Sequence, residues 1–186
     1  MIKITNLSKS FKDKCVIDDF SFTFPKTGLV SITGVSGKGK TTLLNIIAGL
    51  VKQDSGSIEN TYSLLSYSFQ EDRLFPWLSV RKNIEIVLDK VTDKEQIVSE
   101  WLEKIELSNF ADYLPEKISG GMKQRVSLAR ALAYPSEIVL LDEPFKGLDE
   151  DLQKRMHELV KAEAEKRLII MVTHDKSYIS EINIEI

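Results

Sequence analysis

The sequence predicts an α/β fold built on a mostly parallel sheet. A short apolar strand, "GLVSIT" at residues 28–33, leads through a glycine-rich loop into the helical stretch "TTLLNIIAGL". Two more apolar strands, "EIVLLD" at 137–142 and "RLIIMVT" at 167–173, each follow a helical stretch. Strands that alternate with helices pair in parallel, and such sheets bind ligands beyond the carboxyl ends of their strands. The functional site is therefore expected where these strands end.

Size and composition fit one soluble globular domain. The chain has 186 residues, of which 42% are hydrophobic and 28% charged. Its 25 Lys and Arg against 28 Asp and Glu give a net charge of −3, which argues against a nucleic-acid partner because such proteins usually carry a basic excess. The single cysteine, Cys15, excludes an internal disulfide and a cysteine metal site and fits a small apolar filler in a strand. No run reaches the roughly 18 to 20 apolar residues that span a bilayer, so work at a membrane would need a partner subunit.

The N-terminal segment predicts a small antiparallel β layer. The stretches "IKITNLSKSF" and "VIDDFSFTF" alternate apolar and polar residues, as half-buried strands do. Asp13 and Lys14 lie between them and suit a turn. At the other end of the chain, the segment after His174 has room for one further strand.

The middle of the chain has a different character. The stretch "TDKEQIVSEWLEKIEL" predicts a helix with one apolar face. That face is formed by Ile97, Trp101, Leu102 and Ile105. We therefore expect one domain, residues 1–186, in which a mainly helical lobe (about 72–118) is inserted into a core lobe (about 1–71 and 119–186).

The stretch "GVSGKGKTT" matches a phosphate-binding loop. The pattern requires Gly, four free residues, then Gly, Lys and Ser or Thr, and only Gly34, Gly39, Lys40 and Thr41 fill it. Lys40 is thereby assigned to the terminal phosphates of a nucleotide and the Thr41 hydroxyl to Mg²⁺. The second lysine, Lys38, contributes its backbone N–H to the phosphate cradle. Its side chain is expected to point outward.

A pair of carboxylates follows one of the predicted strands. The strand "EIVLLD" delivers Asp142 to its carboxyl end, where a carboxylate holds Mg²⁺, usually through water. The next residue, Glu143, is placed to activate the attacking water as general base, a role worth about 10² to 10⁴ in rate. By itself, an Asp-Glu pair is more often two exposed acids at the end of a strand. Together with the phosphate loop, the pair indicates nucleotide hydrolysis.

The stretch "ISGGMKQRVSLARAL" narrows the choice among the protein families that share a phosphate-binding loop. Ser119, Gly120 and Gly121 precede a helix, whose free N–H groups and dipole favour an anion. The order of phosphate loop, Ser-Gly-Gly helix and Asp-Glu strand resembles the ATP-binding cassette, or ABC, ATPases. Their signature usually reads Leu-Ser-Gly-Gly-Gln, and Ile118 and Met122 stand in its outer positions here. The resemblance covers essentially the whole chain and implies the fold of a P-loop NTPase.

The resemblance also implies roles for further residues. Phe11 would stack on adenine, unless it is simply a core residue. Gln70 would reach the metal and the attacking water, Asp149 would lie in the loop between subunits, and His174 would contact the terminal phosphate. The implied nucleotide contacts are Gly34, Val35, Ser36, Gly37, Lys38, Gly39, Lys40, Thr41, Thr42, Ser119, Gly120 and Gly121. The implied Mg²⁺ ligands are Thr41, Gln70 and Asp142, and the implied catalytic residues are Glu143, His174 and Gln70.

The same resemblance implies partners. Two cassettes would pair head to tail, so that each ATP lies between the phosphate loop of one subunit and Ser119 to Gly121 of the other; hydrolysis would reopen the dimer. An apolar cluster follows Gln70 and comprises Leu74, Phe75, Pro76, Trp77 and Leu78. It either cements the helical lobe or receives a helix of an integral membrane permease.

The motif style is closest to importer cassettes of the nitrate, sulfonate and taurine type. The resemblance thus implies an ATPase on the cytoplasmic face of the cell membrane, which serves a solute-binding protein through the permease. Three alternatives are a soluble ABC ATPase of DNA repair or translation, a small-molecule phosphoryl-transfer enzyme and a cassette that binds ATP without hydrolysis. This sequence has neither the coiled-coil insert of the DNA-repair ATPases nor the second cassette of the translation ATPases, which argues against the first alternative. The intact Glu143, Gln70 and His174 argue against the third. His157, beside the apolar stripe of its helix, is expected to be a partly solvated residue without a role.

Overall fold

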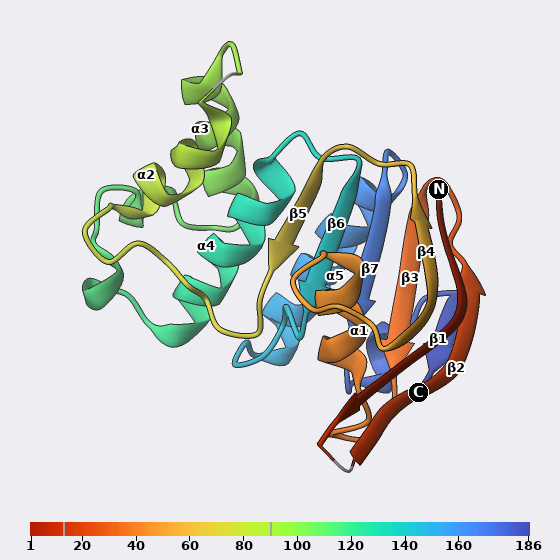
Figure 1. The fold of residues 1–186 in the computed structure, drawn as a ribbon. Coiled ribbons are helices and arrows are strands. Elements are labelled where there is room, and N and C mark those ends of the chain that lie inside the picture. Colours follow the sequence, from red (N-terminus) through yellow and green to blue (C-terminus); the bar gives the residue numbers. More distant parts are fainter. Residues whose placement is uncertain (13, 90) are drawn as a thin grey trace.

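Two β-sheets and a group of helices make up the computed structural model, which describes residues 1–12, 14–89 and 91–186 (Figure 1). A five-stranded sheet has the order β5-β6-β7-β3-β8, and a three-stranded sheet has the order β2-β1-β4. The strands are β1 (Ile2–Phe11), β2 (Lys14–Thr23), β3 (Gly28–Thr33), β4 (Ser55–Asn60), β5 (Leu65–Ser68), β6 (Ile138–Asp142), β7 (Leu168–Val172) and β8 (Ile182–Glu185). The α-helices are α1 (Lys40–Ile47), α2 (Val80–Glu85), α3 (Lys94–Lys104), α4 (Gly120–Ala133) and α5 (Glu150–Ala164).

All four strand pairs of the larger sheet are parallel, as the sequence predicts. Because successive side chains of a strand point to opposite faces, β6 contributes to two hydrophobic cores. Val139 and Leu141 join the core with α4 and α5, while Ile138 and Leu140 join the core with α1 and the smaller sheet. The sheet is therefore covered on both faces, which explains its continuous apolar strands.

The smaller sheet is antiparallel, as predicted, and contains one strand that the sequence did not indicate. Its third strand, β4, has the composition "SGSIEN", in which only Ile58 is partly buried, so it lacks the alternation of a half-buried strand. Lys14, expected in the turn, is instead the first residue of β2 and pairs with Phe11. Asp13 lies outside the described residues.

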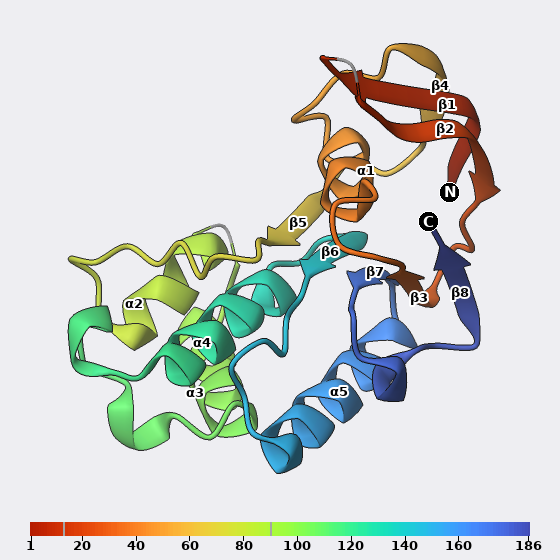
Figure 2. The same cartoon turned by 90° about the horizontal axis from the view of Figure 1, so that it is seen from below.

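Helices α2, α3 and α4 form a group beside the parallel sheet (Figures 1 and 2). The predicted face of α3 is confirmed, since Trp101, Leu102 and Ile105 are buried and Ile97 is partly buried. Helix α4 packs against α2 and α3 as well as β5 and β6, so one hydrophobic cluster continues from the sheet into the helices. The division into two lobes at about residue 118 stays a prediction.

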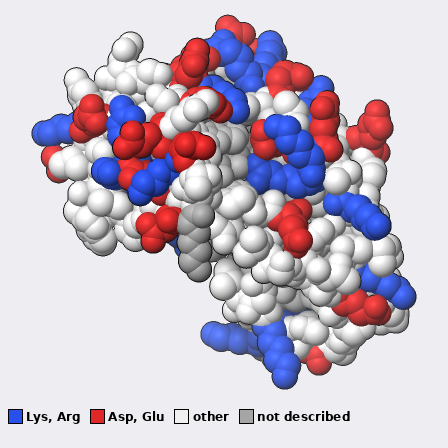
Figure 3. Space-filling view, turned by 90° about the horizontal axis from the view of Figure 1, so that it is seen from above, with Lys and Arg blue, Asp and Glu red and all other residues white. Residues whose placement is uncertain are grey.

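The surface of the described residues carries mixed charge. Figure 3 shows Lys and Arg side by side with Asp and Glu over one face of the molecule. Within the described part of the chain, no helix is long and apolar enough to cross a bilayer.

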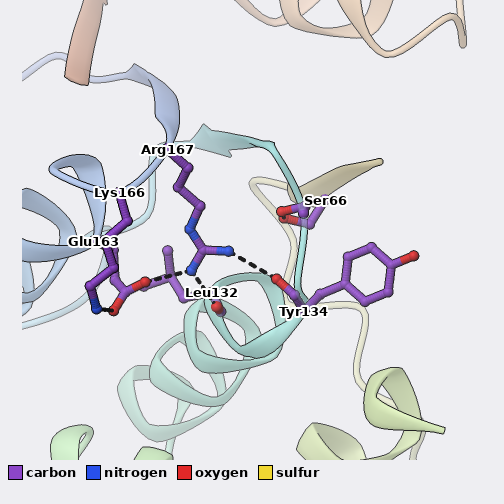
Figure 4. A network of polar contacts seen from close by, with 7 residues as sticks. Ser66, Leu132, Tyr134, Glu163, Lys166 and Arg167 are labelled. Atoms are coloured by element: carbon purple, nitrogen blue, oxygen red, sulfur yellow. Dashed lines mark hydrogen bonds and ion pairs between the residues drawn. The ribbon is translucent and has the colours of Figure 1, made fainter. Parts of the chain in front are cut away.

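A buried ion pair ties the end of α4 to the end of α5 (Figure 4). Arg167 Nη2 lies 2.7 Å from Glu163 Oε2, and its Nη1 donates to the carbonyl of Tyr134 at 2.9 Å. Arg167 also donates to the carbonyl of Leu132, so it satisfies acceptors that the end of a helix leaves free. Lys166 donates to the second Glu163 oxygen at 3.0 Å. The strand β7 therefore starts from a position fixed to both helices.

Candidate active site

The predicted phosphate-binding loop joins β3 to α1, and its backbone turns at glycine residues. Gly39, the N-cap of α1, has φ 93°, and a Cβ there would lie 2.3 Å from the carbonyl oxygen of Val16. Only glycine fits, because the conformation is left-handed and the space is taken by β2. No acidic side chain lies in the first turn of α1. The free N–H groups and positive dipole end of this helix therefore face an anion site.

Lys40 is buried within the loop and Lys38 is exposed, while the Lys38 N–H, predicted to join a phosphate cradle, bonds to a carbonyl of the loop itself. Lys40 is 5% exposed, and its Nζ donates to the carbonyls of Gly34 and Val35 at 2.9 and 3.1 Å. Lys38 is exposed, and its backbone N–H donates to the Val35 carbonyl. The ammonium of Lys40 is thus held inside the loop, which agrees with its assignment to a phosphate. The side chain of Lys38 points outward, as expected.

Asp142, the last residue of β6, lies beside the hydroxyl of Thr41 in the first turn of α1. The Thr41 hydroxyl donates to Asp142 Oδ2 at 2.8 Å, while the buried Oδ1 has no hydrogen-bond partner among the described residues. Burial raises the pKa of the Asp142 carboxyl, although the Thr41 hydrogen bond and the Lys40 charge oppose this. A carboxylate oxygen left free beside a hydroxyl is the kind of donor set that Mg²⁺ uses together with phosphate oxygens. The residues present therefore fit Mg²⁺.

Glu143 is held in a strained backbone conformation next to His174. Its φ of 52° lies in the left-handed region, and its N–H donates to the Val172 carbonyl at 3.0 Å. His174 Nε2 lies 2.9 Å from Glu143 Oε1. Burial raises the pKa of the Glu143 carboxyl, although the His174 and Lys40 charges lower it in part. A carboxyl with raised pKa beside a histidine has the properties of a general base.

One cleft brings these groups together, with a volume of about 190 Å³. It is lined by Val16, Ser36, Gly37, Gly39, Lys40, Thr41, Thr42, Gln70, Glu143, Val172 and His174. Gln70 therefore reaches the same cleft as the phosphate loop, although β4 and β5 separate them in the sequence. Val16 and Val172 were not anticipated from the sequence, because ordinary strand valines carry no motif.

Phe11 lies at the end of β1, outside the residues that line the cleft. It is 48% exposed, so the interpretation as a core residue is wrong. The ammonium of Lys9 lies 5.3 Å from its ring centroid. Stacking of this ring on adenine stays a prediction.

The Ser-Gly-Gly segment is not part of the cleft. Ser119 is the N-cap of α4, where its hydroxyl accepts a hydrogen bond from the N–H of Met122 at 3.3 Å, and Asp149 is the N-cap of α5, where it accepts from Leu152. A Cβ on Gly121 would lie 3.1 Å from the carbonyl oxygen of Gly147, so the two loops are in contact. Within one chain, these predicted nucleotide contacts lie apart from the phosphate loop.

The segment after Gln70 is fixed by one buried and one partly buried polar side chain. Asn83, fully buried in α2, accepts a hydrogen bond from the N–H of Phe75 and donates to the carbonyls of Phe75, Leu78 and Ser79. Arg130 of α4 donates to two further carbonyls of the segment, those of Asp72 and Arg73. Neither residue was singled out from the sequence, because their partners are backbone atoms brought close only by folding.

The fixed segment presents aromatic side chains to the surface. Trp77 is 71% exposed and its ring centroid lies 5.6 Å from that of Phe75. Leu74 and Leu78 are partly buried. The apolar cluster thus has partly buried leucines that pack against the protein and exposed aromatic side chains, and its docking to a permease stays a prediction.

Comparison with known proteins identifies the family. The family model described as "ABC transporter" matches residues 17–146. The chain belongs to the ABC transporter family. It is 40% identical over 169 residues to the aliphatic sulfonates import ATP-binding protein SsuB 1 of Pseudomonas savastanoi pv. phaseolicola, covering 90% of this chain and 71% of that protein. It is 38% identical to the sulfate/thiosulfate import ATP-binding protein CysA of Escherichia coli K12, with 97% of this chain and 55% of that protein aligned.

A solved ABC structure supports the same conclusion for the fold. The dimeric post-hydrolysis state of the ATP-binding cassette MJ0796, bound to ADP and Pi, superposes with a TM-score of 0.85 at 29% identity, covering 96% of this chain and 90% of that one. The chain is therefore an ABC cassette with a P-loop NTPase fold, and as an ABC transporter ATPase it couples ATP hydrolysis to transport. The rival of a soluble ABC ATPase in DNA repair or translation is not favoured, because both relatives are import subunits.

Proposed function

We propose that this chain is the ATP-hydrolysing subunit of an ABC importer, bound peripherally to the cytoplasmic face of the cell membrane. One observation carries the proposal: the phosphate loop, Gln70, Glu143 and His174 line one cleft. The import proteins SsuB and CysA, with which the chain aligns, favour import over export.

The residues in and around the cleft divide into binding and catalytic groups. Lys40 and the N–H groups at the start of α1 hold the terminal phosphates of ATP, and Phe11 stacks on adenine. Thr41, Asp142 and Gln70 hold Mg²⁺, which neutralises phosphate charge when bound. Glu143 accepts a proton from the attacking water, and His174 holds the carboxylate in position and contacts the terminal phosphate.

A second copy of the cassette, paired head to tail, completes the site. Ser119 to Gly121 and Asp149 lie outside the cleft of their own chain, and the exposed N-terminus of α4 suits the phosphates of an ATP bound to the partner. The dimeric MJ0796 structure favours this arrangement. ATP then stabilises the closed dimer, and its hydrolysis lets the dimer reopen.

The apolar cluster after Gln70 receives an integral membrane permease. Trp77 and Phe75 are exposed, while Asn83 and Arg130 hold their backbone in a fixed relation to α2 and α4. Helix α4 also reaches the catalytic loop, because Gln124 donates to the carbonyl of Glu143. Movement at the nucleotide can thus pass through α4 to the permease, and through the permease to a solute-binding protein.

Membrane purification tests this proposal. The tagged chain, purified from detergent-solubilised membranes, should bring an integral membrane partner with it, and Trp77→Glu should lose that partner while still binding ATP. Leu64→Glu is the matched control. Leu64 is also exposed, but it lies just before the start of β5, whereas Gln70 follows the end of that strand. Recovery only with ribosomes or DNA would contradict the transport function. Retention of the partner by Trp77→Glu would remove the apolar cluster from the docking role.

A further inference from the structure

A lysine outside the phosphate-loop motif lies at the outer turn of that loop. Lys14 is the first residue of β2, and a Cβ built on Gly37 would lie 3.6 Å from its Nζ atom. Gly37 lines the cleft. The ammonium of Lys14 is therefore a neighbour of the phosphate-binding wall, although its place in the sequence gives no sign of this.

The hairpin of β1 and β2 explains the position of Lys14. Lys14 pairs with Phe11, and cross-strand partners point to the same face of a sheet. Val16, two residues further along β2, lines the cleft, and the pairing of β1 with β2 shifts register between its neighbours Cys15 and Ile17. The hairpin thus brings an ammonium and an apolar side chain to the phosphate loop, with Phe11 opposite Lys14.

Within the described part of the chain, Lys14 forms no ion pair with a carboxylate. Lys9 on the same sheet lies 2.6 Å from Asp54, whereas the ion pairs of the described residues do not include Lys14. An exposed ammonium beside a loop that binds phosphate has phosphate oxygens as its natural partners.

We propose that Lys14 is a nucleotide-binding residue that contacts a phosphate common to ATP and ADP. Lys40 lies inside the loop and Thr41 lies against Asp142, so these two residues act at the terminal phosphate. Lys14 lies on the hairpin that also carries Phe11, and this places it at the end of the phosphate chain nearer the base. The inference rests on the proposed binding of ATP in this cleft.

Equilibrium binding of ATP, ADP and adenosine to the full chain tests the role of Lys14. Lys14→Gln should weaken ATP and ADP binding about three- to tenfold, reduce the dependence of both affinities on salt, and leave adenosine unchanged. Lys14→Arg should bind all three ligands like the wild type. Lys3→Gln is the matched control, because it removes the same charge from an exposed position at the start of β1.

The other outcomes each overturn the inference. Unchanged ATP and ADP binding in Lys14→Gln would exclude a phosphate contact, and an equal loss for adenosine would show an effect through the base. A loss for ATP alone would place the contact at the terminal phosphate. Lys40→Ala distinguishes a failure of this inference from a failure of the proposed function. If the wild type binds ATP no more tightly than Lys40→Ala, the proposed nucleotide site itself is contradicted.

Discussion

A buried glutamate, Glu163, and a partly buried one, Glu143, have opposite electrostatic surroundings. The side chain of Glu163 is 10% exposed, and that of Glu143 is 15% exposed. Burial alone would raise both pKa values, but hydrogen bonds and charge from Lys166 and Arg167 lower the pKa of Glu163. Burial raises the pKa of Glu143, which lies 2.9 Å from His174, and the charges of His174 and Lys40 offset this only in part.

The difference separates a carboxylate fixed by ion pairs from the carboxylate that we propose as general base. Both oxygens of Glu163 are paired with cations of its own chain, so the charge is fixed and its proton affinity is low. Glu143 is desolvated without an equivalent fixed cation, so it is ready to take a proton. Perturbed carboxyls of the second kind concentrate at catalytic sites.

Replacing Glu143 should have the largest effect. Glu143→Gln keeps the shape of the side chain but removes the base, so we expect ATP turnover to fall by about 10² to 10⁴ while ATP binding is retained. Phosphate release measures the first quantity and nucleotide titration the second. An ATP-bound dimer should also accumulate in size-exclusion chromatography. Hydrolysis near the wild-type rate would remove Glu143 from the catalytic role.

Breaking the structural pair should affect stability instead. Arg167→Met leaves Glu163 buried beside only Lys166 and frees the carbonyls at the end of α4, so the free energy of unfolding should fall by about 3 kcal/mol. Arg155→Met is the control, because the pair of Arg155 with Glu106 is half exposed and should contribute less than about 1 kcal/mol. Urea unfolding measures both. Equal losses would show that burial does not distinguish the two pairs.

Asp142 and Glu163 should produce pH effects of opposite sign. The raised pKa of Asp142 favours its protonated form, so its contribution to stability is present at low pH and is lost as pH rises through the raised value. Asp142→Asn should therefore stabilise the fold at neutral pH by about 1 kcal/mol, at the expense of Mg²⁺-dependent hydrolysis.

For Glu163, the lowered pKa gives stability that is present above the ordinary pKa of glutamate and is lost as pH falls through the lowered value. Glu163→Gln should then be less stable than the wild type at neutral pH, with a difference that shrinks in acid. Thermal unfolding of both variants across pH measures these changes. A gain of stability in Glu163→Gln at neutral pH would contradict the comparison.

The fold was predicted from the sequence where patterns are local and strong. The strands at 28–33, 137–142 and 167–173 are continuous apolar runs, and each lies within one residue of its predicted bounds. The strands β4 and β5 carry no such run, because β4 is mostly exposed and β5 has only four residues. They form because neighbouring strands in the sheets provide hydrogen-bond partners for their backbones. No local sequence pattern encodes this pairing.

The sequence by itself determined the roles that we propose for the residues in and beside the cleft. Gly39, Lys40, Thr41, Asp142 and Glu143 belong to motifs whose spacing is fixed by a single turn or strand end, so their proposed roles follow from local geometry. Tertiary structure alone decided which residues support them. Lys14 reaches the loop through a hairpin, and Arg130 holds the segment after Gln70 through carbonyls 57 and 58 residues away in the chain. Asn83 holds the same segment through carbonyls four to eight residues before it. Such contacts form only when folding brings the residues together, and many of the acceptors are backbone carbonyls, which every residue carries. No pattern in the sequence therefore records them.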